Sequence, residues 1–350
     1  MDGMVKAAPP VFVIAEAGVN HNGELSMAFA LCDAAHAAGA DAVKFQTFRA
    51  EDLVVPGAPT AQYQQRATGE MDQFAMLRSL ELTQQQHEAI QAHCRRIGIE
   101  FFSTPFSIEA VDMLVALGVR RLKLPSGELT HRALVEHAAR QRIPLIVSTG
   151  MATMEEIREA LGWIGAARGD LNDVTVLHCT SAYPAPDEAL NLRAMQSMAR
   201  DLPVAIGYSD HSLGIEAAIV ATALGASVIE KHITLDTTLP GPDHGASLEP
   251  QAFAAMVAGI RRASAMLGDG VKQPTAQEQD TAHVARRSVV AVVDIAAGAR
   301  IEAGMLACRR PATGIPAKHM AEVVGRIANG PIAKGSVLQW TSLDGAMPRP

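Results

Sequence analysis

The chain has 350 residues, of which 48% are hydrophobic and 4% aromatic, and its formal net charge is -7. It can bury a large aliphatic core, and it exceeds the ~250 residues of a plain (β/α)8 barrel by about one small domain. Because an acidic chain without a basic stripe releases few counterions, we expect no nucleic-acid partner and no anionic membrane partner.

The cysteines are scattered along the chain and form no CxxC pair. They are Cys32, Cys94, Cys179 and Cys308. This spacing suggests neither a disulfide framework nor a structural zinc site, so we expect a reducing, cytoplasmic environment. The first apolar run is interrupted by Glu16 and is too short for a signal sequence or a membrane span. We interpret it as a first strand after a frayed start.

Short apolar runs that end in polar clusters recur along the first 235 residues, with helical periodicity between most of them. The predicted strands are 11–16, 42–46, 100–103, 121–124, 145–148, 174–178, 204–208 and 228–232. Repeated strand, polar tip and helix at this cadence is typical of a (β/α)8 TIM barrel, in which the carboxyl ends of several strands build one active site. The fold class is therefore α/β, and the chain is expected to be an enzyme.

Two segments interrupt this rhythm. Residues 50–82 are polar and contain Pro56, Gly57 and Pro59, which favours an extended loop over the barrel mouth. From residue 268 the composition turns to that of a linker, and short strand-like runs with Gly turns follow. We therefore predict a catalytic barrel at 1–267, a linker at 268–285 and a small β-rich domain at 286–350.

Two histidines follow neighbouring predicted strands. His211 and His232 lie one β/α unit apart, so their imidazoles should converge at the barrel mouth. Two independent, hydrogen-bonded histidines would be the ordinary alternative. Two nitrogen ligands without a thiolate suit a labile divalent cation acting as a Lewis acid, such as Mn²⁺, Mg²⁺ or Co²⁺. Of these ions, we expect Mn²⁺ to be the one bound. Glu230 shares a strand face with His232 and is expected to orient a ligand or water.

Two lysines point into the predicted barrel. Lys44 shares a strand face with Gln46, and Lys123 precedes Ser126. An inward lysine either pairs with a carboxylate or awaits an anion, and the sequence leaves both open. Hydroxyls and backbone amides at the neighbouring tips are of the kind that binds phosphate or carboxylate, although each alone is ordinary helix capping. Glu16 is the candidate for acid/base work, unless it only pairs with Lys44.

Several of these tips match a known family. The motifs IAEAGVNHNG, KFQTF, FSTPF, KLPSGE, STGM, LHCTSAYPAP, GYSDHS, EKHIT and GPDH, with RRS and RRPATGI near the end, resemble the bacterial sialic acid synthase family over about residues 11 to 340. The resemblance implies a TIM barrel joined to a C-terminal antifreeze-like (SAF, β-clip) domain, in a domain-swapped homodimer. It also implies that phosphoenolpyruvate condenses with an N-acetylmannosamine-type sugar to give a nine-carbon keto acid and phosphate.

The resemblance further implies a role for each tip residue. The expected phosphoenolpyruvate ligands are Lys44, Thr104, Lys123, Ser126 and Ser148; the expected metal ligands are His211 and His232; the expected sugar contacts are Gln46, Tyr183, Asp243 and Arg310. The metal would polarise the sugar aldehyde, Glu16 would assist the water that adds later, and Arg310 would come from the partner's antifreeze-like domain. Some family members carry an aromatic pair where this chain has Arg286 and Arg287.

We expect an N-acetylneuraminate synthase whose sugar enters without a phosphate. An N,N'-diacetyllegionaminic acid synthase using 2,4-diacetamido-2,4,6-trideoxymannose is the alternative, because the 62–77 segment is shared in outline by both branches. A metal-dependent barrel hydrolase or isomerase would explain Glu16, His211 and His232 but neither the two lysines nor the appended module. Ice binding by the tail would need a flat repeated face, and the tail has no repeat.

Overall fold

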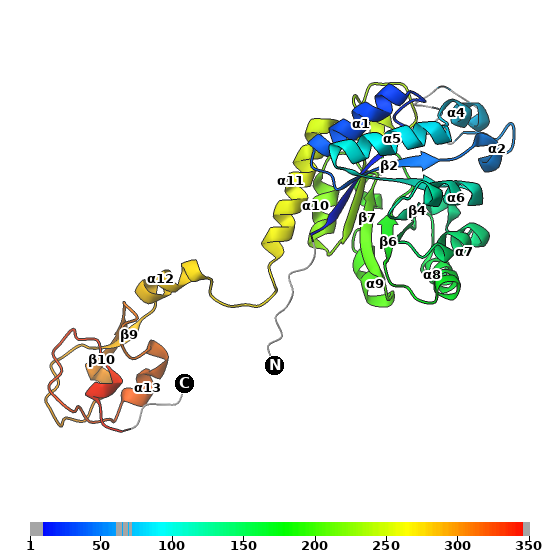
Figure 1. The fold of residues 1–350 in the computed structure, drawn as a ribbon. Helices are drawn as coiled ribbons and strands as arrows, with labels where there is room; N and C mark the ends of the chain where they lie inside the picture. Colours follow the sequence, from blue (N-terminus) through cyan, green and yellow to red (C-terminus); the bar gives the residue numbers. More distant parts are fainter. Residues whose placement is uncertain (1–9, 61–64, 66–68, 70–71, 346–350) are drawn as a thin grey trace. The chain divides into compact units, whose positions relative to one another are not determined.

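The computed structural model describes residues 10–60, 65, 69 and 72–345. The chain divides into two compact units, Met1–Asp269 and Gly270–Pro350, and each has its own apolar core. The two units are coloured blue to yellow and yellow to red in Figure 1. The predicted frayed start at residues 1–9 lies outside the described residues.

Within the described residues, the first unit is built on an eight-stranded parallel sheet whose strand order is β3-β2-β1-β8-β7-β6-β5-β4. The strands are β1 (Phe12–Gly18), β2 (Ala42–Thr47), β3 (Glu100–Pro105), β4 (Leu122–Leu124), β5 (Leu145–Ser148), β6 (Val174–Cys179), β7 (Ala205–Asp210) and β8 (Val228–His232). Strands β3 and β4, at the two ends of this order, contact each other and nearly close a TIM-like barrel. The barrel prediction is confirmed, and each strand begins within one residue of its predicted start.

Helices cover the outside of the sheet (Figure 1). They are α1 (Leu25–Ala37), α5 (Gln84–Ile97), α6 (Ile108–Ala116), α7 (Arg132–Arg140), α8 (Met154–Arg168), α9 (Ala194–Asp201), α10 (Glu216–Ala223) and α11 (Pro250–Leu267). Helix α8 starts at a capping box in which Thr153 and Glu156 satisfy each other's backbone N–H groups, and it ends at Gly169 with φ 92°. In the part of the chain that the structure describes, no helix is both long and apolar enough to cross a bilayer.

The prediction of an extended loop at 50–82 is wrong over part of that segment. Short helices occur there, α2 (Ala50–Leu53) and α4 (Gln73–Ser79), and the Asp72 carboxylate caps α4 by accepting from the Phe74 N–H. Met76 and Leu80 of this region pack in a small apolar cluster with Val19 and Phe48, which explains why the segment folds. Residues 54–60 between these helices contain no helix, as predicted, and residues 61–64, 66–68 and 70–71 lie outside the described residues.

The second unit is small and rich in extended chain, as predicted. Strands β9 (Ser288–Ala291) and β10 (Leu306–Arg309) pair antiparallel, and isolated bridges such as Ile295↔Ile332 extend the pairing. Two helices accompany them, α12 (Ala276–Ala285) and α13 (Met320–Val323). The sequence did not predict α12, which lies in the expected linker and begins at a capping box between Thr275 and Glu278.

Candidate active site

Four ionisable side chains meet inside the barrel, near the carboxyl ends of its strands. Lys44 Nζ lies 2.5 Å from Glu16 Oε2 and 3.6 Å from Glu230 Oε2, while Lys123 Nζ donates to Glu230 Oε1 at 3.0 Å. All four side chains are almost fully buried. Two cations therefore balance two anions away from water, which is the arrangement that buried charges require. Of the two possibilities left open by the sequence, the structure has both lysines paired with carboxylates.

These four groups respond to burial in different ways. For Glu230, burial opposes ionisation, but Lys123 and Lys44 outweigh it and hold the pKa below its usual range. For Glu16, burial dominates over the attraction of Lys44 and raises the pKa. Burial lowers the pKa of Lys123, whereas the carboxylates overcome burial at Lys44 and raise its pKa. Glu16 is thus the carboxyl group of this cluster that takes up a proton more readily.

One hydroxyl group contacts Lys44, and another is buried at the end of β5. The Thr104 hydroxyl accepts a hydrogen bond of 2.9 Å from Lys44 Nζ. The Ser148 hydroxyl is buried, yet it has no hydrogen-bond partner among the described residues. A buried polar atom without a partner marks a place where a ligand or water is to be bound. Ammonium and hydroxyl groups of this kind are suited to bind a small anion such as a phosphate or carboxylate.

Gly150 lies against the hydroxyl groups of Ser126 and Ser181, which we call the hydroxyl wall. Its N–H donates to Ser126 Oγ at 2.9 Å. A Cβ atom at this position would lie 2.1 Å from Ser181 Oγ, 3.0 Å from Ser126 Oγ and 3.1 Å from Cys179 Sγ. Only a glycine lets these side chains approach the backbone so closely. The STG motif is therefore a packing requirement of the hydroxyl wall, as well as a strand tip.

The two predicted metal-binding histidines lie side by side, with ring centroids 5.7 Å apart. His211 Nδ1 lies 2.7 Å from the Thr180 carbonyl oxygen, so it is protonated and donates to that oxygen, and the Nε2 lone pair is left available. His232 Nδ1 is buried and makes no hydrogen bond within the described residues; Asp243 Oδ2 is 3.8 Å away. Burial lowers the pKa of both imidazoles, and His211 lowers that of His232 further. Both rings are neutral near pH 7.

This donor set fits a divalent cation with an open coordination sphere. Neutral imidazole nitrogens are metal ligands, and His211 has the backbone partner that fixes a ligand's ring orientation. Within the described ranges, no group of three or more His, Cys, Asp or Glu side chains converges to hold a metal. A site with His211 and His232 as its protein ligands would leave the other positions to water and substrate, as in a labile Mn²⁺, Mg²⁺ or Co²⁺ site rather than a closed zinc site.

The predicted sugar contacts of the barrel lie around these groups. The Tyr183 ring lies 4.2 Å from the His211 ring, and Gln46 Nε2 donates to Glu16 Oε1 at 3.2 Å. Asp243 is buried, and mainly burial, with a contribution from the Glu16 charge, raises its pKa to about 7. Printed distances thus link the predicted site residues of the barrel into one group, with the exception of Ser126 and Ser148. Arg310 is exposed and belongs to the second unit, where it follows β10.

Sequence reasoning missed part of this site. Ser209 Oγ donates to Glu230 Oε1 at 2.9 Å and lies 3.4 Å from His211 Nε2, so it joins the charge cluster to the histidine pair. The two-residue period of β7 puts Ser209 on the face of His211, and this signal could have found it. Ser181 could not be found in this way, because it follows β6 in irregular chain and its place depends on the approach to Gly150.

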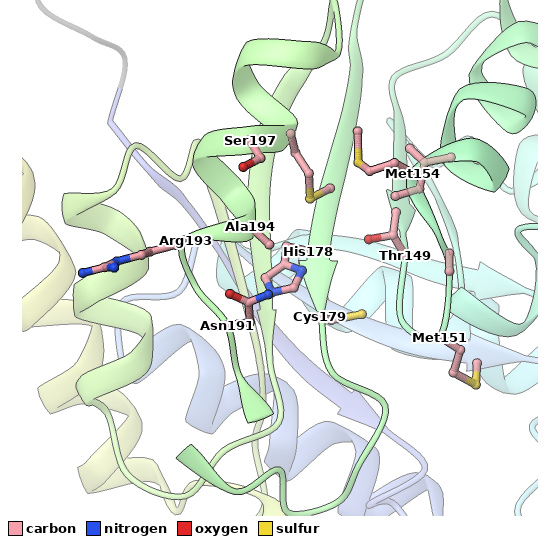
Figure 2. A pocket seen from close by; sticks show the side chains of 12 residues that line it. Thr149, Met151, Met154, His178, Cys179, Asn191, Arg193, Ala194 and Ser197 are labelled. Carbon is pink, nitrogen blue, oxygen red and sulfur yellow. The ribbon is translucent and has the colours of Figure 1, made fainter. Parts of the chain in front are cut away.

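A separate cavity of about 420 Å³ lies between β6 and helices α8 and α9. Figure 2 labels His178, Asn191 and Arg193 among its lining residues, and the Arg193 side chain points away from His178. His178 Nε2 donates to the Leu190 carbonyl oxygen at 2.8 Å. Cys179 lines this cavity and also contacts Ser126. None of the predicted site residues lines this cavity, and no sequence motif predicted it.

Comparison with known proteins finds similarity over most of the chain. The model of the NeuB family matches residues 31–272, and that of the SAF domain matches residues 286–344. The chain is 43% identical to N,N'-diacetyllegionaminic acid synthase of Legionella pneumophila over 336 residues, 95% of this chain and 94% of that one. It is 43% identical to the Campylobacter jejuni protein of the same name over 317 residues, 90% of this chain and 95% of that one. The structure resembles N-acetylneuraminic acid synthetase from Leptospira borgpetersenii, solved with citrate, with a TM-score of 0.70 and 35% identity over 78% of this chain and 90% of that one.

Proposed function

This chain belongs to the NeuB family of nonulosonic acid synthases, and we propose that it is an N,N'-diacetyllegionaminic acid synthase. In this reaction phosphoenolpyruvate condenses with 2,4-diacetamido-2,4,6-trideoxymannose to give a nine-carbon keto acid and phosphate. The family makes the chain an enzyme of the synthase type. The choice of sugar rests on one observation, which is the 43% identity to two diacetyllegionaminic acid synthases over 90–95% of the chain.

N-acetylneuraminate synthase, the first expectation from the sequence, is the second candidate. The solved N-acetylneuraminic acid synthetase is 35% identical, over 78% of this chain, so similarity favours the legionaminate reaction. Both candidates use the same chemistry at the reacting carbons. They differ in whether the acceptor carries an acetamido group or a hydroxyl at C4, and in whether its C6 is a methyl or a hydroxymethyl carbon.

Phosphoenolpyruvate would bind where the lysines and hydroxyls meet. Lys44 and Lys123 are the cations of the cluster, with Thr104, Ser126 and Ser148 beside them. Because Glu16 and Glu230 already neutralise the lysines, the anion gains affinity only if it displaces a carboxylate or adds the hydroxyl contacts. The unpartnered Ser148 hydroxyl supports the second route. Holding the anion here also fixes its methylene carbon relative to the acceptor.

The acceptor aldehyde would lie toward His211 and His232, with Tyr183 against their rings. A divalent ion held by these two imidazoles supplies Lewis acidity that makes the aldehyde carbon electrophilic. Glu16 lies next to Lys44 and is hydrogen-bonded by Gln46, so it stands between the anion subsite and the acceptor subsite. From this place it would orient the water that adds to C2 after the carbon–carbon bond has formed, and accept its proton.

We also propose that the enzyme is a homodimer in which the second unit closes the partner's barrel. The second unit is small, and its only sheet in the described residues is a two-stranded pair, so docking against a barrel would stabilise it. Arg310 would then reach the acetamido group of the partner's sugar as a rigid hydrogen-bonding fork.

Phosphate release from phosphoenolpyruvate tests the proposed reaction. The diacetamido sugar, N-acetylmannosamine and N-acetylmannosamine 6-phosphate should be supplied one at a time, with a no-sugar control. We expect phosphate release only when a sugar is present. The kcat/KM should be about 10-fold or more higher with the diacetamido sugar than with the other sugars, as expected when a site hydrogen-bonds one polar group of its substrate. Preference for N-acetylmannosamine would favour the second candidate. Absence of sugar-dependent release would favour a barrel hydrolase or isomerase.

A further inference from the structure

A second buried ion pair lies on the outward face of the strands that carry the two histidines. Lys231 Nζ lies 2.7 Å from Asp210 Oδ2, and both side chains are 0% exposed. Neither residue takes part in the charge cluster inside the barrel. Their side chains leave the sheet on the opposite face from Ser209 and Glu230, as the two-residue period of a strand requires.

The pair makes further hydrogen bonds that hold the chain directly after β7. Lys231 Nζ also donates to the Ser212 carbonyl oxygen at 2.7 Å. Asp210 Oδ1 accepts from the Ser212 N–H at 2.9 Å and from its hydroxyl at 2.6 Å. The backbone from Asp210 to Ser212 is thus held on both sides of His211. This tip has no freedom to shift without breaking charged hydrogen bonds.

The Asp210–Lys231 pair and its hydrogen bonds to Ser212, here called the clamp, directly precede the two candidate metal ligands in the register of β7 and β8. Asp210 and Lys231 are direct cross-strand partners in the β7–β8 ladder. His211 follows the first of them and His232 follows the second. Whatever fixes the relative position of Asp210 and Lys231 therefore fixes the relative position of the two imidazoles, whose centroids are 5.7 Å apart.

Stability alone is a weak reason for such a pair. Removing two charges from water costs free energy, and well-packed apolar residues of similar volume often stabilise a protein as much or more. Neighbouring positions between the sheet and its helices are occupied by apolar side chains such as Ile206 and Ile229. The hydrogen bonds of an ion pair are directional, so they define one register at the strand ends. Apolar contacts do not define it in this way.

We propose that Asp210 and Lys231 are positioning residues that hold His211 and His232 at the separation needed to share one divalent cation. This inference rests on the proposed metal site of the enzyme. It predicts that loss of the pair weakens metal binding while the phosphoenolpyruvate subsite around Lys44 and Lys123 is unchanged.

The test measures Mn²⁺ binding to the full-length, chelator-stripped protein by electron paramagnetic resonance, alongside the thermal midpoint and steady-state kinetics. The test variant is Asp210→Leu/Lys231→Met, an apolar pair of similar volume. The matched control is Glu100→Gln/Arg121→Met, which removes another cross-strand ion pair at the amino ends of β3 and β4. We expect about 10- to 100-fold weaker Mn²⁺ binding and lower kcat for the test variant, with an unchanged KM for phosphoenolpyruvate, and unchanged Mn²⁺ affinity for the control.

The outcomes separate the two claims. If the wild type binds no Mn²⁺, or His211→Ala binds it equally well, the metal site itself is refuted and the positioning role with it. If His211→Ala loses Mn²⁺ binding but the Asp210→Leu/Lys231→Met variant binds Mn²⁺ as tightly as the wild type, the positioning role alone is overturned. Should the double variant not fold, Asp210→Asn, which keeps an acceptor for Ser212, decides by the same comparison.

Discussion

Glu16 Oε2 lies 2.5 Å from Lys44 Nζ, and both side chains are only 3% exposed. The pair has two consequences for an enzyme that binds an anion. It keeps Lys44 charged inside the barrel, and it places a carboxyl group whose pKa is raised by burial at the border of the proposed anion subsite. Replacing Glu16 should change mainly the KM for phosphoenolpyruvate if it only neutralises Lys44, and mainly kcat if it assists the addition of water.

Replacing Glu16 with Gln should lower kcat by about 10²- to 10⁴-fold, because an acid/base group is lost while the shape is kept. The KM for phosphoenolpyruvate should stay the same or fall, since Lys44 loses a competing anion. Glu100→Gln, at the far end of β3, serves as control. A large rise in this KM with kcat preserved would make Glu16 a structural partner of Lys44.

Gly150→Ala should raise the KM for phosphoenolpyruvate by about 10- to 100-fold, as expected for a lost hydrogen bond to a charged group. The new Cβ would lie 2.1 Å from Ser181 Oγ and 3.0 Å from Ser126 Oγ, so the hydroxyl wall must move. Gly162→Ala in α8 is the matched control, because no heavy atom lies within 4 Å of its added Cβ. Equal kinetics for both variants would show that the wall does not bind the substrate.

The strands, and the convergence of polar residues at their carboxyl ends, were predictable because each apolar run ends in polar residues that a parallel barrel brings to one edge. The pairing of Lys44 with Glu16 was foreseen only as one of two possibilities. The clamp of Asp210 and Lys231 was not foreseen, because a charged side chain on the outward face of a strand is expected to meet solvent. Its burial follows only from the register of β7 against β8 and from the covering helices. Helix α12 was missed because it buries no side chain and so has no apolar stripe.

Acid should destabilise the barrel through His21. Burial, with a smaller contribution from His87, lowers its pKa from 6.5 to about 4 in the folded protein. The unfolded chain therefore binds the proton more tightly than the folded protein. The contribution of His21 to the free energy of unfolding is fully present above pH 6.5 and is lost as the pH falls toward 4. The expected loss at pH 5 is about 2 kcal/mol.

Denaturant unfolding at pH 7.5 and pH 5, monitored by circular dichroism, measures this loss. Other buried histidines add to the total, so the His21 contribution is the difference between the wild type and His21→Asn, which keeps an acceptor for the Gly23 N–H. The variant should lose less stability between the two pH values. Parallel losses in both proteins would contradict the assignment.

Mixing two inactive proteins tests the swapped dimer. Arg310→Ala and His211→Ala homodimers should each be nearly inactive with the sugar. After random subunit exchange, half of the dimers are mixed and one of their two sites is intact, so about a quarter of the wild-type activity should return. Arg309→Ala, which alters the neighbouring exposed arginine, is the control for the first variant. No recovery after verified exchange would mean that the unit caps its own barrel, or that Arg310 does not serve the site.

The most direct test of the proposed function is a competition in one reaction. Phosphoenolpyruvate, Mn²⁺ and equal concentrations of 2,4-diacetamido-2,4,6-trideoxymannose and N-acetylmannosamine are supplied together, and the nine-carbon products are quantified by mass spectrometry. The product ratio equals the ratio of the two kcat/KM values. The account predicts an excess of diacetyllegionaminic acid of about 10-fold or more, with one phosphate released per product. An excess of N-acetylneuraminic acid, or phosphate release without a nine-carbon product, would contradict it.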